Sequence, residues 1–162
     1  MFDPATLALA RDVLERCRAR GWRLATAESC TGGLVAAALT AIGGASEVVD
    51  RGFVAYSNDA KTALLGVPPA TLAAHGAVSA ETALAMAEGA VARAGVELAV
   101  AVTGVAGPGG ATAAKPVGLV HLGVATRAGG RTESHVYPGD RDTVRRAAML
   151  RALELLKAAA EG

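Results

Sequence analysis

Aromatic residues are scarce in this sequence, and glutamine is absent. Phe, Trp and Tyr together make up 3% of the 162 residues. Proteins that bind single-stranded nucleic acid stack its bases on aromatic side chains, and few are provided here. The formal net charge is only +1, so the overall charge balance does not favour a basic nucleic-acid-binding face. We therefore expect no nucleic-acid partner.

Cysteine, histidine and long apolar runs are scarce as well. The two cysteines, Cys17 and Cys30, cannot form a disulfide framework and suit a reducing compartment. His75, His121 and His135 lie far apart without paired-ligand spacing, so we expect no metal site. The sequence opens without a secretion leader and contains no apolar run of about 18 residues. These features predict a cytoplasmic protein that does not enter a membrane.

What the sequence does contain is a large number of small side chains. There are 39 alanines and 20 glycines among the 162 residues. Hydrophobic residues account for 52% and charged residues for 19%, which excludes intrinsic disorder. A chain of this length can bury a core of ordinary size. We expect one domain that spans residues 1–162.

Helical and strand patterns alternate along the chain. Apolar spacing and capping residues predict helices over residues 3–20, 31–41, 57–65, 69–75, 79–94 and 140–160. Apolar runs predict strands over 22–27, 48–56, 97–103, 117–126 and 131–137, the last two joined as a hairpin. This order predicts an α/β fold: a three-layer α/β/α domain with a mixed, mostly parallel sheet and a late antiparallel hairpin.

Ser29 lies at a predicted junction between a strand and a helix. A serine hydroxyl at such a turn is exposed at the sheet edge, beside unpaired N–H groups of the first helical turn. Together they can supply a nucleophile and an oxyanion site formed by Thr31, Gly32 and Gly33. Two alternatives remain open. Ser29 or Thr31 can be a helix N-cap, and Cys30 is a rival nucleophile, although a buried inert thiol is its simpler role.

Tyr56, Asn58 and Lys61 lie around the start of the next predicted helix. A lysine in the first turn opposes the helix dipole, which lowers its pKa, and burial lowers the pKa further. A lysine that is neutral near pH 7 can act as a general base toward a serine hydroxyl. The alternative is a solvated surface lysine with Asp59 nearby.

A glycine-rich loop follows the buried strand that ends at Thr103. It reads Gly104-Val105-Ala106-Gly107-Pro108-Gly109-Gly110 and leads on to Lys115. A loop of this kind after a buried strand is a common ligand-binding arrangement in α/β sheets. It lacks the Gly-Lys-Ser/Thr ending of a triphosphate-binding loop and the spacing of the dinucleotide fingerprint. A flexible loop without a ligand is the alternative.

Arg141 and Arg145 lie four residues apart near the start of the last predicted helix, so they share one helical face. Cations at this end of a helix oppose its dipole, and an anion between them would resolve the conflict. A ligand phosphate is one candidate. A structural ion-pair network with Asp140 and Asp142 is the other.

Together these segments resemble the CinA C-terminal domain family in its short, stand-alone PncC-type form. The resemblance runs from about Leu7 to Leu156, with residues 111–114 less polar than the family pattern. It is carried by these ordered motifs: Ala27-Glu28-Ser29-Cys30-Thr31-Gly32-Gly33, Arg51-Gly52-Phe53-Val54-Ala55-Tyr56-Ser57-Asn58-Asp59-Ala60-Lys61, His75-Gly76-Ala77-Val78-Ser79, Gly104-Val105-Ala106-Gly107-Pro108-Gly109-Gly110, Lys115-Pro116-Val117-Gly118 and Gly139-Asp140-Arg141.

The resemblance implies deamidation of nicotinamide mononucleotide to nicotinic acid mononucleotide and ammonia. The implied protein is an amidohydrolase without a cofactor, and its partner is a small-molecule pyridine mononucleotide. We also expect a homo-oligomer, taken as a dimer. A non-catalytic module that binds or senses a pyridine nucleotide is the alternative, and an amidohydrolase for another small amide is a third possibility. Only the enzymes need both Ser29 and Lys61.

The expected mechanism assigns a role to each candidate residue. Ser29 attacks the carboxamide carbon, neutral Lys61 takes its proton, and Tyr56 orients Lys61 or donates to the substrate. Lys115 is a possible further influence on the pKa of Lys61. Asn58, Thr103 and Gly104 are expected to contact the ring or ribose. The other expected substrate-binding residues are Thr31, Gly32, Gly33, Gly107, Lys115, Arg141 and Arg145.

Overall fold

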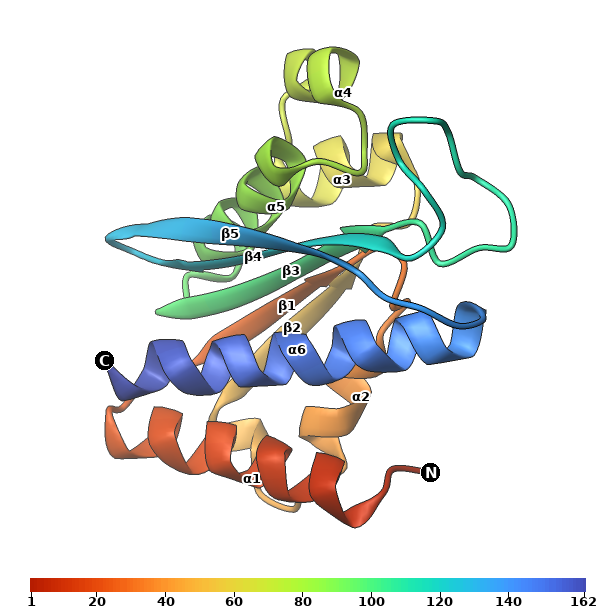
Figure 1. The fold of residues 1–162 in the computed structure, drawn as a ribbon. Coiled ribbons are helices and arrows are strands. Elements are labelled where there is room, and N and C mark those ends of the chain that lie inside the picture. Colours follow the sequence, from red (N-terminus) through yellow and green to blue (C-terminus); the bar gives the residue numbers. More distant parts are fainter.

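The chain folds around one five-stranded sheet (Figure 1). The computed structural model describes all residues from 1 to 162. The strand order is β2-β1-β3-β4-β5. β1 pairs in parallel with β2 and β3, and β4 pairs antiparallel with β3 and β5. Only β4 runs against the other strands, which confirms the mixed, mostly parallel sheet with a late hairpin. The strands are β1 (Leu24–Glu28), β2 (Val49–Val54), β3 (Leu98–Gly104), β4 (Leu119–Thr126) and β5 (Gly129–Val136).

Helices cover both faces of the sheet, which confirms the predicted three-layer α/β/α architecture. One face carries α1 (Pro4–Ala19), α2 (Leu34–Thr40) and α6 (Arg141–Glu161). The other carries α3 (Asn58–Leu65), α4 (Pro69–His75) and α5 (Ala80–Ala94). A short 3₁₀ helix, η1 (Ala45–Glu47), precedes β2 and was not predicted. No helix combines the length and the apolar character that crossing a membrane requires.

The helix predicted over residues 31–41 begins later in the structure, at Leu34. Residues 31–33 instead form a turn between β1 and the helix. Gly32 and Gly33 have φ angles of +58° and +103°, in the left-handed region that strains side chains with a Cβ. The glycines therefore insert a turn after Ser29 rather than the first turn of a helix.

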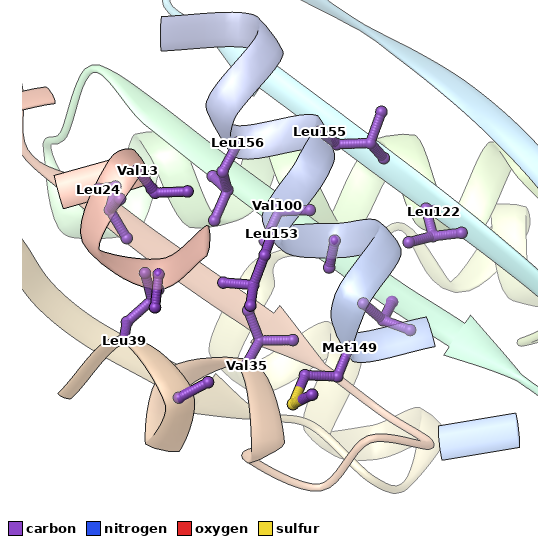
Figure 2. Packing of buried hydrophobic residues seen from close by; sticks show 14 of the residues in the cluster. Val13, Leu24, Val35, Leu39, Val100, Leu122, Met149, Leu153, Leu155 and Leu156 are labelled. Atoms are coloured by element: carbon purple, nitrogen blue, oxygen red, sulfur yellow. The ribbon is translucent and has the colours of Figure 1, made fainter. Parts of the chain in front are cut away.

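The larger core lies between the sheet and helices α1, α2 and α6. β3 directs Leu98, Val100 and Val102 toward this face, while Ala99 and Ala101 of the same strand face α5. Both sets are buried because helices cover both sides of the sheet. Figure 2 shows how the helices and strands fill this core with apolar side chains, among them Val13, Leu24, Val35, Leu39, Val100, Leu122, Met149, Leu153, Leu155 and Leu156.

The opposite face is lined mainly by small residues, so α5 approaches the sheet and α3 closely. A Cβ at Gly123 of β4 would lie 2.5 Å from the carbonyl oxygen of Ala83 in α5. A Cβ at Gly89 of α5 would lie 1.9 Å from the carbonyl oxygen of Leu65 in α3. The alanine and glycine content noted in the sequence therefore serves close packing on this face.

Replacing Gly89 with alanine is expected to destabilise the fold by about 3 kcal/mol, the upper part of the range for overpacking. Alanine favours a helix by about 1 kcal/mol over glycine, but its Cβ would overlap the Leu65 carbonyl and push α3 away. Urea denaturation followed by circular dichroism measures the change. Gly43→Ala is the control, because no atom lies within 4 Å of its added Cβ. Equal effects at the two positions would contradict the close-packing explanation.

Candidate active site

Loops at the carboxyl ends of four strands surround a cavity of about 250 Å³. They are the Ser29 turn after β1, the start of α3 after β2, the glycine-rich loop after β3 and the start of α6 after β5. Ligand sites of α/β proteins usually lie at this edge of the sheet. The cavity brings together these predicted site residues: Ser29, Tyr56, Asn58, Lys61, Thr103, Gly104, Gly107 and Arg141.

Ser29 and Lys61 form a buried pair on one wall of the cavity. The Nζ of Lys61 lies 2.9 Å from the Oγ of Ser29 and donates to the carbonyl oxygen of Ala55 at 3.0 Å. Lys61 is only 1% exposed. Ser29 is fixed in turn by its own N–H, which donates to the carbonyl oxygen of Val102 in β3 at 2.8 Å. A serine and a lysine 32 residues apart in sequence therefore meet at hydrogen-bond distance.

The surroundings of Lys61 favour its neutral form. Burial lowers the pKa of Lys61 below its ordinary value of 10.5, and only a nearby Cys30 thiolate would work against this shift. No carboxylate forms an ion pair with its Nζ. A buried ammonium without an anionic partner is costly, so the group tends to lose its proton. The neutral amine has the lone pair that a general base for Ser29 needs.

Cys30 lines the same cavity but is a poor nucleophile. Burial raises the pKa of its thiol to about 11, and the reactive species of cysteine is the thiolate. Near neutral pH almost all of Cys30 is therefore the unreactive thiol. The arrangement favours Ser29 over Cys30 as the attacking group.

The predicted oxyanion donors, the N–H groups of Thr31, Gly32 and Gly33, are not all free. The N–H of Gly32 donates to the carbonyl oxygen of Ser29 at 3.0 Å, which closes the turn. The N–H groups of Cys30, Thr31 and Gly33 have no hydrogen-bond partner within the chain. The N–H of the residue after the nucleophile is a common oxyanion donor. Of these three residues only Cys30 lines the cavity, so its N–H is the candidate donor.

Tyr56 and Arg141 meet at the mouth of the cavity. Arg141 donates from Nη1 to the carbonyl oxygen of Gly107 and from Nη2 to the hydroxyl of Tyr56, both at 2.9 Å. Tyr56 is 61% exposed. The role predicted for Tyr56 as the group that orients Lys61 is not seen, because its hydroxyl contacts Arg141 instead. The Arg141 guanidinium retains further N–H donors for an anionic ligand.

Arg145 does not line the cavity, contrary to the prediction from its spacing to Arg141. Its guanidinium donates from Nε to the carbonyl oxygen of Cys30 and from Nη2 to that of Thr31, both at 3.1 Å. Thr31, Gly32 and Gly33 are not part of the cavity lining either. Arg145 thus binds the backbone of the Ser29 turn outside the cavity and does not face a ligand.

Lys115 also lies outside the cavity lining. Its Nζ donates to the carbonyl oxygen of His75 at 2.7 Å, at the end of α4. The expected influence on Lys61 is not seen, since burial alone lowers the pKa of that lysine. Lys115 instead anchors the segment that leads from α4 into the cavity wall.

The sequence prediction missed the wall formed by Ala77 and Val78. The hydroxyl of Thr103 donates to the carbonyl oxygen of Ala77 at 2.7 Å. Thr103 therefore fixes this wall as well as lining the cavity. Only the His75-Gly76-Ala77-Val78-Ser79 motif of the family resemblance drew attention to the segment.

Comparison with curated proteins finds relatives along most of the chain. A CinA-like protein of Anaeromyxobacter dehalogenans is 56% identical over 147 residues, which cover 91% of this chain and 36% of the relative. A CinA-like protein of Geobacter sulfurreducens is 51% identical over 140 residues, 86% of this chain and 34% of that protein. The chain thus spans about a third of the length of the curated relatives it matches.

Solved structures match over almost the full length of both chains. The competence/damage inducible protein CihA from Agrobacterium tumefaciens superposes with a TM-score of 0.93 at 49% identity, covering 100% of this chain and 99% of that one. A CinA superfamily protein from Klebsiella pneumoniae gives a TM-score of 0.92 at 38% identity, covering 96% and 98%. The family model described as the CinA C-terminal domain matches residues 6–160. The chain therefore belongs to the CinA C-terminal domain family, as its sequence motifs predicted.

Proposed function

We propose that this chain is an amidohydrolase that converts nicotinamide mononucleotide to nicotinic acid mononucleotide and ammonia. The observation that carries the proposal is the 2.9 Å contact between Lys61 Nζ and Ser29 Oγ in a buried setting that lowers the pKa of the lysine. Family membership and the cavity beside this pair support it. A module that only binds a pyridine nucleotide needs the cavity but has no use for an activated serine.

In the first half of the reaction Ser29 becomes acylated. Its Oγ attacks the carboxamide carbon while its proton passes to the neutral Nζ of Lys61. The carbonyl oxygen acquires negative charge, and the unpaired N–H of Cys30 lies next to the nucleophile to stabilise it. The C–N bond then breaks, and the proton on Lys61 moves to the leaving nitrogen, so ammonia departs. A neutral lysine also avoids repulsion of the positively charged pyridinium ring.

In the second half water releases the product. A water molecule attacks the acyl carbon and gives a proton to Lys61. The bond to Ser29 Oγ breaks as Lys61 returns this proton to the serine. The product carries a carboxylate in place of the carboxamide. Lys61 thus serves as base and acid in turn, and the enzyme is restored without a metal or redox step.

Substrate binding uses the rest of the cavity lining. The glycine-rich loop contributes four glycines to the lining, at positions 104, 107, 109 and 110, and a backbone without side chains there suits close approach of a sugar and ring. Arg141 lies at the mouth, where its free N–H groups can bind the phosphate with charge-assisted hydrogen bonds. Asn58 and Thr103 line the same cavity as Arg141 and the Ser29–Lys61 pair. The proposed orientation places the carboxamide inside and the phosphate at the mouth.

A coupled ammonia assay tests the function directly. The chain is expected to release ammonia from nicotinamide mononucleotide faster than from nicotinamide, its riboside or unrelated small amides. Binding of the mononucleotide without ammonia release would favour the sensing module. Faster release from another amide would assign a different substrate to the same site.

Replacing Arg141 with alanine is expected to raise KM for the mononucleotide by about 10- to 100-fold, the equivalent of a charge-assisted contact of about 1.5–3 kcal/mol. The KM for the riboside, which has no phosphate, should change far less. Steady-state kinetics on both substrates measure the difference. Arg146→Ala is the control, because it removes a charge from the same helix at a side chain that pairs with Asp3 instead. Equal effects of Arg141→Ala on both substrates would assign Arg141 a structural role.

A further inference from the structure

We infer that Glu28, which does not line the cavity, is a positioning residue that holds the Ser29 turn in its reactive shape. The inference rests on the proposed role of Ser29 as the nucleophile. Glu28 is the last residue of β1 and is 0% exposed. A carboxylate without solvent must be satisfied by hydrogen bonds inside the protein. The hydrogen-bond donors of the Glu28 carboxylate therefore identify the segment that Glu28 holds in place.

The Glu28 carboxylate reaches across the turn to the start of α2. Its Oε1 accepts from the N–H of Val35 at 2.9 Å and its Oε2 from the N–H of Ala36 at 3.0 Å. Thr26 adds a hydroxyl donor to Oε2 at 3.2 Å. The carboxylate thus closes a loop around residues 29–34, with the end of β1 on one side and the first turn of α2 on the other.

Because Glu28 binds the N–H groups at the start of α2, the Ser29 hydroxyl is not needed as the N-cap of this helix. The N-terminus of a helix is ordinarily capped by a nearby serine or threonine side chain, which was the alternative role of Ser29 and Thr31. In α2 the N-cap is Gly33, which has no side chain to offer. Glu28 supplies the acceptors instead, so the Ser29 hydroxyl is free to pair with Lys61.

Arg145 of α6, a helix on the same face of the sheet as α2, supports the turn as well. Its two hydrogen bonds to the carbonyl oxygens of Cys30 and Thr31 come from α6. The carbonyls of the turn are thereby bound, while the N–H groups of Cys30 and Thr31 stay unpaired. A turn held at both its flanks and its carbonyls keeps its nucleophile and N–H donors fixed without reorganisation during the reaction.

The test compares Glu28→Gln with wild type in the full chain. The glutamine keeps the shape but loses one of the two carboxylate oxygens that accept from Val35 and Ala36. We expect kcat for the mononucleotide to fall about 10- to 100-fold, the scale of a small misplacement of reacting groups, with KM within about threefold. A second readout is the labelling rate of Ser29 by a fluorophosphonate, in which the serine oxygen bonds to phosphorus and fluoride leaves. This rate should fall in parallel with kcat.

The matched control is Asp3→Asn, which weakens another carboxylate cap. Asp3 accepts from the N–H and hydroxyl of Thr6 at the start of α1, away from the cavity. It should lower the melting temperature but leave kcat and the labelling rate unchanged. If Glu28→Gln behaves like Asp3→Asn, Glu28 is only a helix cap and the inference is wrong.

Should Glu28→Gln fail to fold, Arg145→Lys takes its place, because a lysine cannot span both carbonyls. It should show the same loss of kcat and labelling.

The two readouts separate the inference from the proposed function. A wild-type chain that is labelled at Ser29 but releases no ammonia from the mononucleotide overturns the substrate assignment. The labelling rates of Glu28→Gln then still decide the role of Glu28. A chain that releases ammonia with unchanged kcat in both Glu28→Gln and Arg145→Lys overturns the positioning role alone. A wild-type chain that is neither labelled nor active overturns both.

Discussion

Ser29→Ala is expected to lower kcat for nicotinamide mononucleotide by about 10³-fold or more, the scale found when a covalent nucleophile is removed. The substitution deletes one oxygen atom, and with it the attacking group and the partner of Lys61 Nζ. The cavity walls, Arg141 and the backbone N–H groups all remain. Binding of the mononucleotide should therefore be nearly unchanged, which calorimetric titration can measure beside the kinetics.

Cys30→Ala is the matched control for this substitution. It removes a polar atom from the next residue in the same cavity, but the raised pKa of its thiol leaves little thiolate at neutral pH. Activity should stay close to that of wild type. More than about a tenth of the wild-type rate in Ser29→Ala would refute covalent catalysis by this serine. An inactive Cys30→Ala beside an active Ser29→Ala would transfer the role to the thiol.

Lys61→Arg is expected to be nearly as inactive as Lys61→Ala, with a loss of about 10²- to 10⁴-fold, the usual contribution of a general base. An arginine keeps a positive charge and a similar reach but does not lose its proton in a protein. Wild-type activity should rise with pH along one ionisation, because the base works only when neutral. Since burial lowers the pKa of Lys61 below 10.5, this rise should lie below the range of an ordinary lysine.

The pH dependence of the unfolding free energy gives an independent check on the lowered pKa of Lys61. A lysine whose pKa is lower in the folded state than in the unfolded state binds fewer protons when folded. Its contribution to the unfolding free energy therefore becomes more favourable as pH rises from the folded pKa toward 10.5. Lys61→Met, which cannot titrate, should fold and should lose this part of the pH dependence. An active Lys61→Arg with an unchanged pH profile would make Lys61 a binding charge rather than the base.

The sequence pointed to Ser29 and Lys61, which the structure brings within 2.9 Å, but not to how the chain supports this candidate pair. Ser29 and Lys61 were identifiable because each lies where a strand gives way to a helix, a position visible in local pattern. Arg145 was assigned to a ligand because spacing alone places it on the same face as Arg141. Its actual bonds go to backbone carbonyls 115 and 114 residues away, and no local pattern encodes such a contact.

In the fold, too, features set by local sequence were predictable, whereas contacts between segments far apart in sequence were not. The layers and the late hairpin follow from the helix and strand patterns along the chain, whereas the strand order comes only from the structure. The late start of α2 follows from two glycines whose φ angles are positive. Glu28 escaped notice because a glutamate at the end of a strand looks like an ordinary polar terminus. Its role depends on α2 folding back over the strand end, which brings two N–H groups to one carboxylate.

The dependence of the site on α6 sets an order of events when the chain is made. Ser29 leaves the ribosome before Arg145, which binds the carbonyl of Cys30 from 115 residues away. At about 5–20 residues per second, this separation corresponds to roughly 6 to 23 seconds of synthesis. Contacts of such long range also slow folding, because the loop between them must close first. A nascent chain therefore carries Ser29 and Lys61 for some seconds before Arg145 can complete the candidate site.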